Sequence, residues 1–185
     1  PRESLYRFIG PPLHESYEKF YSFSREQAMQ AVSYYREYYE EKGMFENEVY
    51  PGIKQLLRDL IKQGVLCLVA TSKPEIYAKK ILDYYELSNY FYYIAGANMD
   101  GTRTDKAEVI AYALKQIPAE YSNKKVLMVG DRSHDIIGAK KNGIDCAGVL
   151  FGYGSREELE EAGADFVADS VEAVRNIVFL NAAKN

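Results

Sequence analysis

The segment GDRSHD, residues 130–135, sets two carboxylates four residues apart. A short apolar run over residues 126–129 precedes it and is typical of a strand buried on both faces. Asp131 then lies at the carboxyl end of that strand. Asp135 falls in the first turn of a helix predicted over residues 135–142 and points back toward Asp131. Mg²⁺ prefers oxygen ligands and keeps several waters, so two carboxylates and a substrate phosphate suffice to bind it. The alternative is that both aspartates only cap the helix and interact with its dipole.

A second polar group consists of Thr71, Ser72 and Lys73, at the end of another apolar run. These residues lead directly into a helix predicted over residues 74–84, whose first N–H groups have no partner within the helix. A hydroxyl beside such N–H groups forms a cradle for an anion such as phosphate. Taken alone, this segment favours the alternative that Thr71 and Ser72 only cap the helix.

Lys106 stands at the start of a helix predicted over residues 106–116. A lysine is unfavourable at this end of a helix, which already carries partial positive charge, so Lys106 requires an anion nearby. A solvated surface lysine is the ordinary alternative. The joint occurrence favours a site, because the hydroxyl, the lysine and the aspartates each follow a strand, and ligands of open α/β sheets bind beyond the carboxyl ends of the strands.

The elements that must position these residues alternate between helix and strand from Tyr50 onward. Such alternation predicts βαβ units, and hence an α/β fold with a parallel sheet flanked by helices. Strands are predicted at residues 65–70, 92–95, 126–129, 146–150 and 166–167. The remaining helices are predicted at residues 53–61, 155–162 and 170–180.

The beginning of the chain has a different pattern. Gly10, Pro11 and Pro12 form a rigid loop, and Ser24 with Gln27 forms a capping box at the start of an amphipathic helix that Gly43 ends. We therefore expect a small helical domain over residues 1–48 and an α/β domain over residues 49–185.

The composition of the chain argues against some classes of function. A net charge of −4, a pI of about 5.4 and the absence of a long basic run argue against a nucleic-acid partner. We find no apolar run of membrane-spanning length and no secretory signal, so a cytoplasmic protein without a membrane partner is expected. Cys67 and Cys146 lack the spacing of a metal or redox site and are expected to be reduced core thiols.

Together these motifs resemble the haloacid dehalogenase superfamily, specifically its phosphoglycolate phosphatase-like branch with a helical cap. Thr71 in LVATSKPE resembles the second family motif, Lys106 the third, and GDRSHD the fourth. FIGPPLHESY, residues 8–17, resembles the opening of the cap, and GVLFGYGSREEL, residues 148–159, the segment after a late strand of the sheet. The resemblance implies a Rossmannoid three-layer core with a parallel sheet and a small all-α cap.

The resemblance also implies a Mg²⁺-dependent phosphatase of a small phosphorylated metabolite, acting through an aspartyl phosphate that water then hydrolyses. By position, Asp131 would bind Mg²⁺, and Asp135 would bind it directly or through water. Thr71, Ser72 and Lys73 would bind the phosphate, and Lys106 would clamp it, with Thr71 and Lys106 as the catalytic pair. Gly10 and its neighbours would bring the cap over the substrate.

One family motif is missing. The first motif, D-x-D-G-T at the end of a strand, supplies the nucleophile and does not occur in this chain; MDGT at residues 99–102 lies before Lys106 and lacks the first aspartate. The resemblance implies that the missing strand is central, between the strands that end at Thr71 and Gly130. We therefore expect about forty further residues upstream in the natural protein, and no activity from the 185 residues by themselves.

The substrate stays open between a phosphoglycolate-like ester and a nucleotide monophosphate. A phosphosugar mutase is a related alternative, although the mutases tend to carry Glu where this chain has Gly130. An alternative from a different class of function is a non-catalytic phosphate-binding or regulatory module without a nucleophile.

Overall fold

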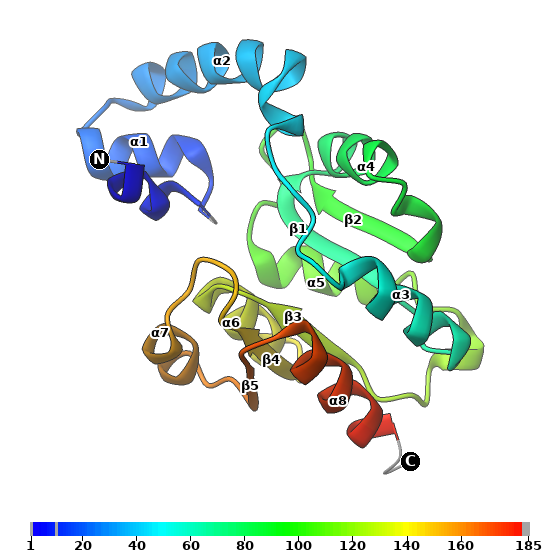
Figure 1. Ribbon diagram of the computed structural model, residues 1–185. Helices are drawn as coiled ribbons and strands as arrows, with labels where there is room; N and C mark the ends of the chain where they lie inside the picture. Colours follow the sequence, from blue (N-terminus) through cyan, green and yellow to red (C-terminus); the bar gives the residue numbers. More distant parts are fainter. Residues whose placement is uncertain (1, 10, 183–185) are drawn as a thin grey trace. The chain divides into compact units, whose positions relative to one another are not determined.

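The structure, a computed structural model, describes residues 2–9 and 11–182 of the chain. The chain divides into two compact units, residues 1–48 and 49–185 (Figure 1). None of the described helices combines the length and the apolar character needed to cross a bilayer.

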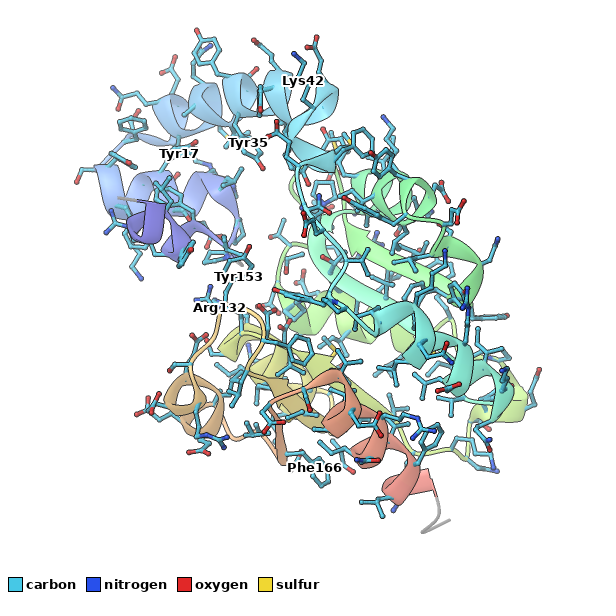
Figure 2. All side chains as sticks on the ribbon, in the orientation of Figure 1. Tyr17, Tyr35, Lys42, Arg132, Tyr153 and Phe166 are labelled. Carbon is cyan, nitrogen blue, oxygen red and sulfur yellow. The ribbon has the colours of Figure 1, made fainter. Side chains whose placement is uncertain are left out.

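The first unit is helical. It comprises the 3₁₀ segment η1 (Arg2–Phe8), α1 (Leu13–Tyr21), α2 (Arg25–Glu41) and the 3₁₀ turn η2 (Gly43–Phe45). The predicted capping box is confirmed, since Ser24 Oγ accepts from the Gln27 N–H at 3.2 Å and Gln27 Oε1 accepts from the Ser24 N–H at 2.9 Å. Aromatic rings pack on one another in this unit: Tyr17 of α1 lies 5.6 Å from Phe8, and Tyr35 of α2 stacks on Tyr39 at 5.1 Å (Figure 2 labels Tyr17 and Tyr35).

The second unit is the predicted α/β fold, with every pair of neighbouring strands parallel. β1 (Leu68–Pro74) pairs with β2 (Tyr93–Ala97), and β3 (Leu127–Gly130), β4 (Asp145–Val149) and β5 (Phe166–Ala168) pair in that order as a second sheet. The helices are α3 (Ile53–Lys62), α4 (Glu75–Tyr84), α5 (Lys106–Leu114), α6 (Ser133–Lys141), α7 (Arg156–Glu161) and α8 (Val171–Ala182). The 3₁₀ turns are η3 (Ser88–Tyr90) and η4 (Ala119–Tyr121).

β4 shows why helices cover both faces of its sheet. Successive side chains of a strand point to opposite faces, and Cys146 packs with α6 and α7 whereas Val149 packs with α3 and α8. Cys146 is fully buried, as expected for a core thiol, while Cys67 is half-buried. α5 covers β2 and also contacts α6, where Asn142 Nδ2 donates to the Ala107 carbonyl at 3.0 Å. The α5–α6 contact therefore connects the two sheets.

Two predictions about strands were wrong. β1 runs from Leu68 to Pro74 rather than over residues 65–70, and all of its residues are half-buried. β3, predicted to be buried on both faces, exposes 39% of Val129. In the described part of the chain, β1 and β3 each have a strand neighbour on one edge only.

Candidate active site

Asp135 is the best-defined carboxylate of the site. α6 begins at Ser133, two residues earlier than predicted, so Asp135 is its third residue and is 6% exposed. Asp135 Oδ2 accepts from the backbone N–H groups of Asp131 at 3.0 Å and Arg132 at 3.1 Å, so the carboxylate points back as expected. A Cβ atom on Gly130 would lie 2.3 Å from the Cβ atom of Asp135, which explains the glycine at this position.

Lys106, the first residue of α5, has the anion that its position requires. Its Nζ atom lies 2.8 Å from Asp135 Oδ1 and donates to the Ala70 carbonyl of β1 at 3.1 Å. The Lys106 side chain is 14% exposed, so the solvated-surface alternative is wrong. Lys106 thus joins β1, at Ala70, to α6, the helix that follows β3.

Thr71 and Ser72 do not cap α4. That helix begins at Glu75 after Pro74, which makes no side-chain capping hydrogen bond, because the irregular end of β1 separates the hydroxyls from the helix. Thr71 Oγ1 instead accepts from the Lys73 N–H at 3.2 Å. Burial lowers the pKa of Lys73. The hydroxyls therefore remain at the carboxyl end of β1, close in sequence to Ala70, the residue that Lys106 contacts.

Asp131 is held by the segment that follows β4. Its Oδ2 atom accepts from the Tyr153 N–H at 2.8 Å, and Figure 2 places Arg132 and Tyr153 at the same end of the second sheet. A Cβ atom on Gly152 would lie 2.3 Å from the Asp131 Cβ atom, and one on Gly154 would lie 2.1 Å from its carbonyl oxygen. The close approach explains the two glycines. Reasoning from single residues missed this segment, although a Gly-x-Gly pair just after a strand was the available signal.

The donor set fits Mg²⁺ in part. The described residues contain no group of three or more His, Cys, Asp or Glu side chains that could hold a metal. Within the same residues, no protein hydrogen bond reaches Asp131 Oδ1, whereas both oxygens of Asp135 already accept from donors. Since Mg²⁺ needs only one or two protein carboxylates, Asp131 Oδ1 can bind it directly and Asp135 through water.

Two further sequence expectations concern loops. Gly10 lies outside the described residues. Asp100 of the MDGT segment stabilises the turn in which it lies, because Asp100 Oδ1 accepts from the N–H and the hydroxyl of Thr102 at 2.9 and 2.7 Å. That arrangement agrees with the interpretation of MDGT as a loop and not as the nucleophile motif.

Arg103 was also missed from the sequence. Its Nε atom donates to the Gly96 carbonyl at 2.8 Å, its guanidinium lies 3.3 Å from Glu75 Oε2, and it stacks 3.8 Å above the ring of Tyr112. Arg103 therefore ties the loop that precedes Lys106 to the start of α4.

The chain is similar to proteins of a known hydrolase family. The model of the haloacid dehalogenase-like hydrolase family matches residues 1–149. A 5′-nucleotidase of Pseudomonas aeruginosa is 39% identical over 176 residues, which cover 94% of this chain and 78% of that protein. A phosphoglycolate phosphatase of Vibrio vulnificus is 28% identical over 94% of this chain and 75% of its own length.

The tyrosine-protein kinase PtkA of Mycobacterium tuberculosis is 39% identical over 86% of this chain, but the match spans only 53% of the kinase. Among solved structures, a predicted phosphatase from Clostridium acetobutylicum superposes with a TM-score of 0.89 at 43% identity, over 97% of this chain and 82% of that chain. Because the family model matches most of the chain and the nucleotidase is 39% identical over 94% of it, the chain belongs to the haloacid dehalogenase-like hydrolase family.

Proposed function

We propose that this chain provides most of the active site of a Mg²⁺-dependent phosphomonoesterase that acts on small phosphorylated metabolites. The observation that carries the proposal is the contact of Lys106 with Asp135 and with the Ala70 carbonyl, at 2.8 and 3.1 Å. This contact brings the Lys106 ammonium beside the Asp135 carboxylate and beside Ala70, which precedes Thr71 in β1. We propose that the ligand binds there, beyond β1 and β3, as ligands do in α/β folds.

The nucleophile would come from an aspartate on a strand that inserts between β1 and β3. The free edges of these two strands, and the exposure of Val129, support that position. The first aspartate of the D-x-D-G-T motif would attack the phosphorus, and the leaving alkoxide would take a proton from the second, acid-base aspartate of that motif. Water would give its proton to this second carboxylate and cleave the aspartyl phosphate.

The residues of this chain would bind and orient the substrate. Thr71 and the Ser72 N–H would donate to phosphate oxygens, and the Lys106 ammonium would offset their charge. Bound Mg²⁺ would supply charge stabilisation for the transferring phosphoryl group, held by Asp131 and, through water, by Asp135.

The substrate class is drawn from the relatives. A 5′-nucleoside monophosphate is favoured over phosphoglycolate, because the nucleotidase is 39% identical and the phosphoglycolate phosphatase 28%. A phosphosugar mutase is disfavoured, since a side chain at Gly130 would collide with Asp135.

The test is a hydrolysis assay with a longer protein that carries the proposed strand. Nucleoside monophosphates, phosphoglycolate and sugar phosphates would be supplied with Mg²⁺ or with EDTA, and Asp131→Asn would serve as the inactive control. We expect Mg²⁺-dependent release of phosphate that Asp131→Asn abolishes. Turnover equal in Asp131→Asn would refute the metal assignment. Transfer of label to tyrosine without release of phosphate would instead favour the kinase chemistry for which PtkA is named.

A further inference from the structure

Glu158 of α7 binds the two residues that directly follow Asp131. One of its oxygens, Oε1, accepts from the Ser133 N–H at 2.8 Å, from Ser133 Oγ at 2.9 Å and from Arg132 Nε at 2.9 Å. These three donors belong to the start of α6, and Glu158 lies 25 residues further along the chain than Ser133. The first turn of α6 is therefore fixed from outside the helix.

The contact is partly shielded from water. The side chains of Arg132 and Glu158 are 18% and 26% exposed, so solvent screens this pair less than it screens a surface pair. Burial raises the pKa of Glu158, but the hydrogen bonds from Ser133 and Arg132 outweigh it and leave that pKa below its ordinary value. The carboxylate is therefore ionised at neutral pH and makes charge-assisted hydrogen bonds.

The same segment also holds the Asp131 carboxylate. The Tyr153 N–H binds Asp131 Oδ2 at 2.8 Å, and Ser155 Oγ accepts from the Glu158 N–H at 3.2 Å at the start of α7. Residues 152–158 thus hold Asp131 in two ways. Tyr153 binds its carboxylate, and Glu158 binds the two residues that follow it. Asp131 Oδ1 is left without a protein hydrogen bond in the part of the chain that the structure describes.

We propose that Glu158 is a positioning residue for the metal ligand Asp131: it holds the Ser133 backbone N–H and the Arg132 side chain, and so keeps Asp131 Oδ1 available to Mg²⁺. The inference rests on the proposed Mg²⁺-dependent function and deepens it. Residues that orient metal ligands in this way typically contribute about 10- to 100-fold to metal affinity.

The test compares Glu158→Gln with Glu160→Gln in the longer protein that carries the proposed strand. Glu160 lies on the same helix and pairs with Arg156 at the surface, with its side chain 54% exposed, so its variant removes the same charge without touching α6. Binding of Mn²⁺, followed by its electron paramagnetic resonance signal without substrate, gives a readout independent of turnover.

We expect the Mn²⁺ dissociation constant to rise about 10-fold in Glu158→Gln and to stay unchanged in Glu160→Gln. The Mg²⁺ concentration for half-maximal activity should rise by the same factor, while kcat at saturating Mg²⁺ returns to within about threefold of wild type. Glu158→Asp, which keeps the charge on a shorter stem, should restore part of the affinity.

Ser133→Ala removes one donor and leaves the ion pair, and we expect it to weaken Mn²⁺ binding about threefold, as loss of one modest hydrogen bond would. Equal Mn²⁺ affinity in wild type, Glu158→Gln and Ser133→Ala would overturn the role of Glu158 and leave the proposed phosphatase intact. Failure of the wild-type protein to bind Mn²⁺ at all would overturn the proposed function and this inference with it.

Discussion

At the scale of single residues, Gly130 is a position where the surrounding structure leaves no room for a side chain. Any Cβ atom at this position would lie 2.3 to 2.4 Å from the Cβ and carboxylate atoms of Asp135, whose side chain is 6% exposed. Relief would require the Asp135 carboxylate to leave its two N–H donors and Lys106. The glycine therefore allows the carboxylate to pack against the end of β3.

Gly130→Ala should lower the free energy of unfolding by about 2–4 kcal/mol, since it combines overpacking with broken buried hydrogen bonds. Urea denaturation followed by circular dichroism measures the loss. Gly64→Ala is the matched control, because its Cβ atom would meet nothing within 4 Å and only the φ angle of +72° opposes it, at about 1 kcal/mol. Equal losses in the two variants would contradict the steric explanation.

Lys106→Ala should reduce kcat on the order of 10²-fold or more, as loss of a charge-stabilising group does. It should also destabilise the fold, because the mostly buried Asp135 would lose its cation. A phosphate-release assay and a thermal melt measure the two effects. Lys115→Ala, at the other end of α5 and exposed, should change neither quantity. Full activity of Lys106→Ala would remove Lys106 from the catalytic residues.

At the scale of elements, the sequence predicted the positions of helices and strands far better than it predicted which residues contact one another in the fold. Periodicity and caps are local signals, and they placed Thr71, Lys106 and Asp131 at strand ends and helix starts. They carried no information on which residues Lys106 and Glu158 contact, because Ala70 and Ser133 lie 36 and 25 residues away. Such contacts depend on how β1, α5 and α7 pack, and only the folded chain reveals that.

Asp165 connects β4 to the start of β5, and its ionisation makes the contribution of this contact to folding stability depend on pH. Its carboxylate forms a salt bridge with Lys140 and accepts from the Cys146 N–H at 2.8 Å. The hydrogen bond from Lys140 is the main cause that lowers the pKa of Asp165. A folded-state pKa below the unfolded value of about 3.9 stabilises the fold above that value, and the gain disappears as pH falls through the folded-state pKa.

Asp165→Asn should therefore lower the free energy of unfolding by about 1–2 kcal/mol at pH 7, the range for hydrogen bonds to a charged group that is partly exposed. The difference from wild type should shrink as the pH falls below about 4. Urea unfolding curves from pH 7 to pH 3 measure it. A difference that stays constant with pH would show that the charge of Asp165 does not contribute.

At the scale of the whole molecule, the second unit contains two parallel sheets where the alternation of helices and strands in the sequence predicted one. Lys106 and the α5–α6 contact connect the sheets, yet β1 and β3 each keep one edge without a strand neighbour among residues 49–182. Unpaired edges expose N–H and C=O groups that readily pair with another strand. A strand placed there would bring its carboxyl end beside Thr71, Lys106 and Asp131.

Amide hydrogen exchange distinguishes an inserted strand from two separate sheets. In a longer protein that carries the proposed strand, we expect the amides of β1 and β3 to exchange at least about 100-fold more slowly than in the 185-residue chain, because pairing would require opening of the core before exchange. The amides of β4, already paired on both sides, serve as the internal control and should change much less. Phosphate release should accompany the protection, since the same strand would supply the nucleophile. Equal exchange at β1 and β3 in both proteins would place the nucleophile elsewhere and leave the two sheets as the native arrangement.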